Sequence, residues 1–225
     1  MQSVAGRSTR SLDRTKGGTV KLDELERAVR EHAGEFLCER IHNEKDTKLV
    51  RFAHVVGAPE GGYINVPPVG KLGDFYETFG SIHFYHDEKS GDAGKYLAHP
   101  SHWADLHEAF NAWVEDLDEE ERRECVPSWI DTCLVIGETP HSGNYILVPT
   151  KGPETGHVVE FDHDGFEFTD EAEDIVEYVK KLLKPDSSTL TAIASHMRFI
   201  EGDPMVQWWI RELRDNAGRV VATRV

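Results

Sequence analysis

The segment from Glu160 to Glu171 is the part of the chain whose residue types come closest to a metal-binding pattern. It matches the twelve-position calcium loop at positions 3, 5, 6 and 12, and Glu160 stands where aspartate is expected at position 1. However, a strand and not a helix is predicted before the loop, and Asp162 to Gly165 is also a common turn sequence. A turn between a strand and a helix is therefore the favoured interpretation.

The histidines and cysteines do not form a catalytic or metal-binding pattern. His102 and His107 are five residues apart on a predicted helix, which separates them by about 140° around its axis. His83 and His86 are three residues apart in a predicted strand and so face opposite sides of it. The sequence contains no His-Glu-x-x-His, Cys-x-x-Cys, Gly-x-Ser-x-Gly or phosphate-binding glycine motif. We therefore predict no catalytic residue, no metal and no cofactor, and a protein that is not an enzyme.

Seven acidic side chains lie within residues 115–124. A run of this kind is usually a solvated helix end. The functional alternative is an acidic surface that docks a basic protein, because complementary potentials raise association rates and select partners. The candidate residues are Glu115, Asp116, Glu119 and Glu120, with Asp162, His163 and Asp164 at the end of a predicted strand and Trp208 as an aromatic anchor.

The composition narrows the class of protein. The chain has 225 residues, with 41 acidic and 25 basic side chains and a net charge of −16. Residues 1–18 carry four basic side chains and one acidic side chain, so the remainder carries −19. This charge argues against a nucleic-acid partner, and the longest apolar runs are far shorter than the roughly 20 residues that cross a bilayer. Three cysteines without metal-like spacing fit reduced thiols, so we predict a soluble, cytoplasmic protein with no membrane partner.

Helices are predicted from apolar residues at three- and four-residue spacing. The predicted helices cover residues 21–36, 101–117 and 170–183, with a shorter one at 74–79. The second places Trp113 on its apolar face, and the third begins with Asp170 and Glu173 spaced as in a capping box. Residues 1–20 are rich in Ser, Thr, Gly and Arg, which predicts a flexible leader.

Alternating apolar residues between turn signals predict a sheet. The predicted strands cover residues 48–56, 63–66, 81–86, 132–137, 144–150 and 157–162. The last three are joined by loops too short for a parallel crossover, so they form an antiparallel meander. In the C-terminal 40 residues, helices at 188–199 and from Asp203 precede a possible edge strand at 219–225.

The order of these elements predicts an α+β fold with a central antiparallel β-sheet, a meander, flanked by N- and C-terminal helices. Residues 21–185 form this domain. Residues 186–225 form a C-terminal helical extension packed on it, and Trp208 points away from the apolar face of the last helix.

Several short segments share the pattern of a known family. In the second half of the chain they are Ile136-Gly137-Glu138, Gly143-Asn144-Tyr145-Ile146-Leu147, the Gly-x-Val strand and Asp-His turn of Gly156–Asp164, and the helix Ile175–Leu183. Upstream they are Phe75–Gly80 and Leu97–Trp103. Together these segments resemble the SUKH superfamily over about Leu22 to Leu183, most closely in its C-terminal half. Asn144 replaces the usual Asp, Val148-Pro149 departs from Leu-Asp, and the tail from Pro185 has no counterpart.

The resemblance implies a non-enzymatic α+β module. Bacterial members of the family are largely immunity proteins that neutralise toxin domains, and fungal relatives regulate cell-wall assembly. The first hypothesis is therefore an immunity-type protein whose acidic surface covers a basic toxin domain. The second is an intracellular regulatory scaffold, and the third is a calcium-binding or hydrolytic site around Asp162, His163 and Asp164.

Overall fold

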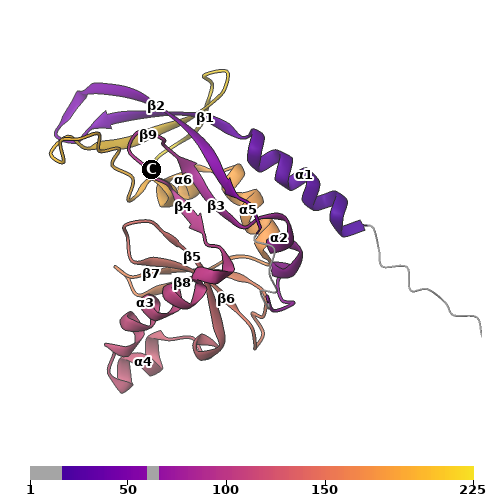
Figure 1. Ribbon diagram of the computed structural model, residues 1–225. Coiled ribbons are helices and arrows are strands. Elements are labelled where there is room, and N and C mark those ends of the chain that lie inside the picture. The colour runs from indigo at the N-terminus through magenta and orange to yellow at the C-terminus, as the bar shows by residue number, and fades with distance from the viewer. Residues whose placement is uncertain (1–16, 60–65) are drawn as a thin grey trace, which may run out of the picture.

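The computed structural model describes residues 17–59 and 66–225, which form a ten-stranded antiparallel sheet with helices packed on it (Figure 1). The strand order is β10-β9-β1-β2-β3-β4-β5-β6-β7-β8, so the first eight strands follow the chain as a meander. The predicted α+β fold with a central antiparallel sheet is confirmed.

The strands are β1 (Ala33–Arg40), β2 (Asn43–Gly57), β3 (Ser81–His86), β4 (Lys95–Leu97), β5 (Cys133–Thr139), β6 (Asn144–Pro149), β7 (Val158–Asp162), β8 (Glu167–Ala172), β9 (Trp208–Asp215) and β10 (Val220–Thr223). The α-helices are α1 (Gly17–Glu31), α2 (Leu72–Thr78), α3 (Trp103–Glu115), α4 (Glu119–Cys125), α5 (Ile175–Leu183) and α6 (Ser187–Ala194). None of the helices in the described residues combines the length and the apolar character that a membrane span requires.

Two predictions fall mainly on residues outside those that the structure describes. Residues 1–16 of the predicted leader lie there, and α1 begins at Gly17 within the leader's last four residues. Residues 63–65 of the predicted strand at 63–66 lie there as well.

The C-terminal segment departs most from the prediction. The helix predicted from Asp203 is wrong, because residues 208–215 form β9, which pairs with β1. Ile210 and Leu213 are both buried although they are three residues apart, a spacing typical of a helix. A bulge opposite β1 leaves Arg211 without a partner in the ladder and returns Leu213 to the core face. The segment 186–225 is therefore not a helical extension: it contributes α6 and two strands that widen the sheet.

The first helix is shorter than predicted at its C-terminal end. α1 ends at Glu31, and Phe36 belongs to β1. Gly34, Phe36 and Cys38 are buried at alternate positions, as expected for a strand with one face on the core. The apolar positions continue the helical spacing of α1 by coincidence, and the pairing of β1 with β2 and β9 decides the local structure.

The start of α5 is also displaced from its predicted position. Asp170 lies in β8, and α5 begins after Asp174. The Oδ1 atom of Asp174 accepts hydrogen bonds from the backbone N–H groups of Val176 and Glu177 at 2.9 and 3.0 Å. Asp174 is therefore the N-cap, and the capping box predicted from Asp170 is wrong.

Two hydrophobic cores lie on opposite faces of the sheet. In β6, Ile146 and Val148 point into the main core, whereas Tyr145 and Leu147 point into the second core. Helices α1, α2, α5 and α6 cover the main core, and α3 covers the second core with Phe110 at its centre. The end of α3 and the whole of α4 extend from this second layer at one end of the molecule (Figure 1).

Candidate functional site

The acidic segment 115–124 forms the end of α3 and the start of α4. Asp118 is the N-cap of α4, and its Oδ1 atom accepts hydrogen bonds from the N–H groups of Glu120 and Glu121 at 2.8 and 2.9 Å. The side chain of Glu121 accepts one from the N–H of Asp118 at 3.0 Å, which completes a capping box. Acidic residues in a first turn are also stabilised by the helix dipole. Local structure therefore explains why Asp118 and Glu121 are acidic.

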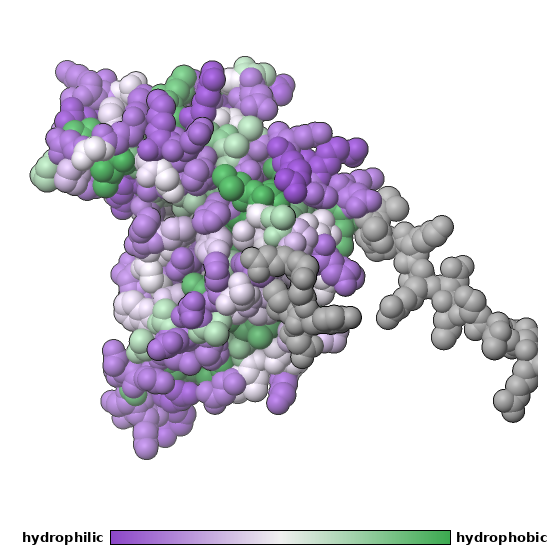
Figure 2. Space-filling model, viewed as in Figure 1, coloured by the Kyte–Doolittle hydropathy of each residue, from purple (hydrophilic) through white to green (hydrophobic). Residues whose placement is uncertain are grey.

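Five acids of this segment take no part in the capping box, and Glu124 is set apart from the others in the last turn of α4. The remaining four, Glu115, Asp116, Glu119 and Glu120, we call the α3–α4 acidic surface. All four are exposed. Within the described part of the chain, no Lys, Arg or His nitrogen lies within 4.0 Å of their carboxylate oxygens. Figure 2 shows that this end of the molecule, over α3 and α4, is strongly hydrophilic.

The second acidic segment, Asp162 to Asp164, begins at the last residue of β7 and continues into the turn before β8, so the predicted strand-to-helix turn is in fact a turn between two strands. Asp162 and Asp164 are exposed. The Oδ1 atom of Asn144 accepts hydrogen bonds from the backbone N–H and the Nδ1 of His163 at 3.0 and 2.7 Å. This leaves Nε2 of His163 directed to Asp164, with a distance of 3.1 Å to its Oδ1 atom.

Trp113 joins the two acidic segments. Its ring lies against the His163 ring with 4.9 Å between centroids, and 38% of the Trp113 residue remains exposed. Asp116, the C-cap of α3, is three residues after Trp113 and about 60° from it around the helix axis, so it lies on the Trp113 side of α3 with the β7–β8 turn. Glu115 is about 160° from Trp113 and points to another side of the helix. Trp113 is not on the buried face that its spacing predicts, because Val114 takes that place. The signal is present in the sequence: at 100° per residue, Trp113 is about 80° from Trp103, whereas Val114 is about 20° from it.

The structure does not bring Trp208 to this surface. Trp208 lies on β9, and six strands separate β9 from β7 in the sheet. Its side chain is half-buried against the main core, and the Lys48 Nζ atom lies 4.7 Å from the ring centroid. Among the predicted partner-binding residues, Trp208 is therefore set apart, and Trp113 is the exposed aromatic residue beside the acids.

The calcium-loop interpretation of residues 160–171 is wrong in its two end positions. Glu160 is directed into the protein and bonds to Lys95 and Tyr178, and Glu171 pairs with Lys181. Among the described residues of this loop, the side chains left as possible metal ligands are those of Asp162, His163 and Asp164. Their potential ligand atoms lie within 4.8 Å of one another. Calcium prefers six to eight oxygen ligands, and two exposed carboxylates supply few of them.

We therefore expect calcium to leave the stability of the protein unchanged. The melting temperature should agree to within about 1 °C between about 2 mM calcium and about 2 mM EDTA, because a ligand stabilises only in proportion to its affinity for the folded state. Differential scanning calorimetry checks this. A rise of about 5 °C or more in calcium would instead indicate a site with a dissociation constant of roughly 0.2 mM or lower.

A buried polar group, which we call the Lys95 cluster, consists of Lys95, Thr139, Glu160 and Tyr178. The Lys95 residue is 3% exposed, and its Nζ atom donates to Glu160 Oε2 at 2.6 Å and to Thr139 Oγ1 at 2.9 Å. The hydroxyl of Tyr178 donates to the other oxygen of Glu160 at 2.5 Å. Burial opposes ionisation of Glu160, but the charge of Lys95 and these hydrogen bonds outweigh it and hold the Glu160 pKa below its usual value.

The Lys95 cluster adjoins a cavity of about 150 Å³ that is lined by residues of β4, β7, β8, α5 and α6. Burial and the Glu160 carboxylate raise the pKa of Tyr178 well above its usual value, so its hydroxyl stays a donor. Every member of the cluster has a hydrogen-bond partner, which is typical of a structural network. Sequence analysis missed it, although Glu160 has the same strand parity as the buried Val158 and so points to the core.

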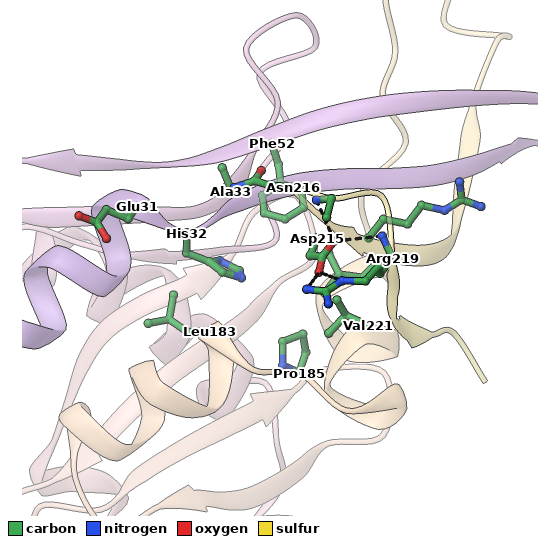
Figure 3. Close-up of a pocket in the computed structure, with 13 residues that line it drawn as sticks. Glu31, His32, Ala33, Phe52, Leu183, Pro185, Asp215, Asn216, Arg219 and Val221 are labelled. Atoms are coloured by element: carbon green, nitrogen blue, oxygen red, sulfur yellow. Dashed lines mark hydrogen bonds and ion pairs between the residues drawn. The ribbon is translucent and has the colours of Figure 1, made fainter.

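A second cavity, of about 310 Å³, lies between the start of β1, the β9–β10 turn and the end of α5. Figure 3 shows the His32 ring directed into it, with Leu183 and Pro185 nearby and the Asp215–Arg219 ion pair on its far side. The backbone N–H of Tyr85 donates to His54 Nδ1 at 2.9 Å. His54 Nε2 therefore carries the ring proton and donates to His32 Nδ1 at 2.8 Å, which leaves the Nε2–H of His32 toward the cavity.

The environment of this histidine pair keeps both rings neutral. Burial, and then the proximity of His32, lowers the pKa of His54 to about 3, and burial lowers the pKa of His32. Sequence analysis did not single out either residue. The signal for His54 is its strand parity with the buried Val50 and Phe52.

Comparison with known proteins places the chain in no family. No protein-family model, no curated protein and no solved structure matches the chain. Function is therefore inferred from the residues themselves and from their arrangement.

Proposed function

We propose that this chain is a non-enzymatic, immunity-type protein that binds and neutralises a basic toxin domain. Its binding site consists of the α3–α4 acidic surface, the β7–β8 turn and Trp113. One observation carries the proposal: the exposed Trp113 ring lies against His163 and so unites two acidic segments that are far apart in the sequence. The immunity role itself rests on the resemblance to the SUKH superfamily, and the basic character of the partner rests on the charge of the surface.

The acidic side chains and Trp113 contribute differently to binding of the partner. Exposed ion pairs contribute only about 0.2–1 kcal/mol each, so the acids act mainly by steering a basic partner and selecting its orientation. A tryptophan that loses water on binding contributes more to affinity, because aromatic residues with rims of polar groups are typical hot spots. Trp113 has that position, with Asp116 on its side of α3 and the His163 ring against its own.

The first test reverses the charge of the surface. A variant with Glu115, Asp116, Glu119 and Glu120 replaced by lysine should bind the partner on the order of 100-fold more weakly, because four attractive contacts become repulsive. The partner is first captured with the wild-type chain and purified, and its affinity for each variant is then measured by isothermal titration calorimetry.

Trp113→Ala should leave the rate of association with the partner unchanged and should raise the rate of dissociation about 10-fold or more.

The matched control reverses four exposed acids elsewhere, Glu24, Glu77, Glu88 and Glu173, and has the same net charge. It should bind within about threefold of wild type, because long-range attraction is screened within about 10 Å at physiological salt. Equal loss in both variants would show that only net charge matters and would contradict the proposed surface. Neutralisation is tested separately by expressing the partner domain in cells with and without the chain: if the partner is not toxic, the immunity role fails while the surface stands.

A further inference from the structure

Two arginine side chains stack on one tryptophan at the end of the sheet farthest from α3 in strand order. The guanidinium carbons of Arg198 and Arg224 lie 4.6 and 4.7 Å from the centroid of the Trp209 ring. Arg198 is held further by hydrogen bonds from its Nη1 atom to the carbonyl oxygens of Ser195 and Met197. Arg224 is held by its backbone N–H, which donates to the carbonyl of Arg211 at 2.9 Å.

Within the described residues, the guanidinium groups of Arg198 and Arg224 form no ion pair. Arg211 pairs with Glu39 at 2.7 Å, but in the described residues no carboxylate oxygen lies within 4.0 Å of a guanidinium nitrogen of Arg198 or Arg224. Burial, Arg198 and Arg211 lower the pKa of Arg224. Three guanidinium groups thus lie near each other with two carboxylates close by: Glu39 pairs with Arg211, and Asp92 accepts the backbone N–H of Arg198 and acts on its charge. Such an arrangement is favourable when an anion is bound.

A groove of about 870 Å³ opens beside Arg224. Its basic lining residues are Arg211 and Arg224, Arg40 at the end of β1 and Lys45 in β2, and two acidic residues, Glu39 and Glu44, line it as well. Arg40 is paired with Asp46, whereas the Lys45 ammonium group lies within 4.0 Å of no carboxylate oxygen among the described residues. The volume is in the range of small-molecule sites, about 300–1,000 Å³.

We propose that this groove, the Arg224 groove, binds a small molecule that carries a chain of phosphate groups. Guanidinium groups match phosphate oxygens with two parallel hydrogen bonds, and a lysine adds a point charge. Several cations held together despite their repulsion suit a ligand with several negative charges better than a single carboxylate. The Trp209 ring fixes Arg198 and Arg224 before binding, which reduces the entropy lost when the anion binds.

The ligand chemistry is that of a phosphoanhydride, which occurs both in free pyrophosphate and in nucleotides. Wild-type protein is titrated with pyrophosphate, ATP and AMP, at an ionic strength matched with sodium chloride, and binding is followed by calorimetry and by tryptophan fluorescence. Pyrophosphate and ATP should bind, and AMP should bind more weakly because it has one phosphate. Equal affinity for pyrophosphate and ATP indicates that phosphates alone are recognised; tighter binding of ATP indicates a contact with the nucleoside.

Arg224→Gln should weaken pyrophosphate binding about 10- to 100-fold, because it removes a charge-assisted hydrogen-bond pair. Arg224→Lys keeps the charge but not the planar fork, and should give an intermediate loss. Arg51→Gln is the control, since Arg51 is exposed on β2 and pairs with Glu35 outside the groove. Binding that is absent in wild type, or that Arg224→Gln and Arg51→Gln reduce equally, would overturn the proposal.

Discussion

Replacing Lys95 by methionine is expected to lower the free energy of unfolding by about 3–5 kcal/mol, because it leaves the Glu160 carboxylate buried without its cation. The same substitution on an exposed lysine, Lys151→Met, should change stability by no more than about 0.5 kcal/mol. Urea denaturation followed by circular dichroism measures both.

A second substitution shows whether the unpaired charge is the cause. Glu160→Gln in the Lys95→Met background removes the charge and keeps an acceptor for the Tyr178 hydroxyl. It should recover more than half of the lost stability. If the double variant is as unstable as Lys95→Met, the loss comes from packing around β4 and not from the ion pair, and the electrostatic account of the Lys95 cluster is wrong.

The second large effect is a loss of stability in weak acid that depends on His54. Unfolded, His54 takes up a proton near pH 6.5, whereas in the folded protein its pKa is about 3. The unfolded state therefore binds more protons between these values, and stability falls as the pH is lowered. From pH 7 to pH 5 the contribution of His54 is about 2 kcal/mol, and His32 adds to it in the same direction.

His54→Gln provides the comparison, because glutamine has both an acceptor and a donor but does not titrate. The decrease in unfolding free energy from pH 7 to pH 5 should be about 2 kcal/mol smaller in this variant than in wild type. Urea denaturation at a series of pH values gives the two slopes. Parallel slopes would mean that His54 is already protonated in the folded protein at pH 5, which the donated hydrogen bond from the Tyr85 N–H contradicts.

The part of the fold that sequence analysis predicts best is the meander. β5, β6 and β7 are consecutive, their apolar residues alternate, and their loops are short, so local signals agree with the final pairing. The predictions fail where long-range pairing overrides a helical spacing. In β9 a bulge places Ile210 and Leu213 on one face, and in β1 the partners on both sides determine that Phe36 belongs to a strand.

The exposure of the acids could be predicted from the sequence, but the exposure of Trp113 could not. Exposed acids can be identified from a run of like charge, because no core position tolerates such a run. Whether Trp113 is exposed depends on a rotation of α3 about its axis by less than the angle between two successive residues. In the structure Val114 takes the buried position and Trp113 remains exposed. The Lys95 cluster depends on β4, a strand of three residues that only its neighbours β3 and β5 define.

Hydrogen–deuterium exchange of the chain, alone and with its purified partner, tests the central claim most directly. The proposed binding site predicts that protection on binding is concentrated in two segments, residues 111–124 at the end of α3 and in α4, and residues 162–166 in the β7–β8 turn. The remaining exposed segments, including the β1–β2 turn beside the Arg224 groove, should exchange at unchanged rates. Protection confined to the β1–β2 turn and β9, with no change in residues 111–124, would contradict the claim that the acidic surface around Trp113 is where the partner binds.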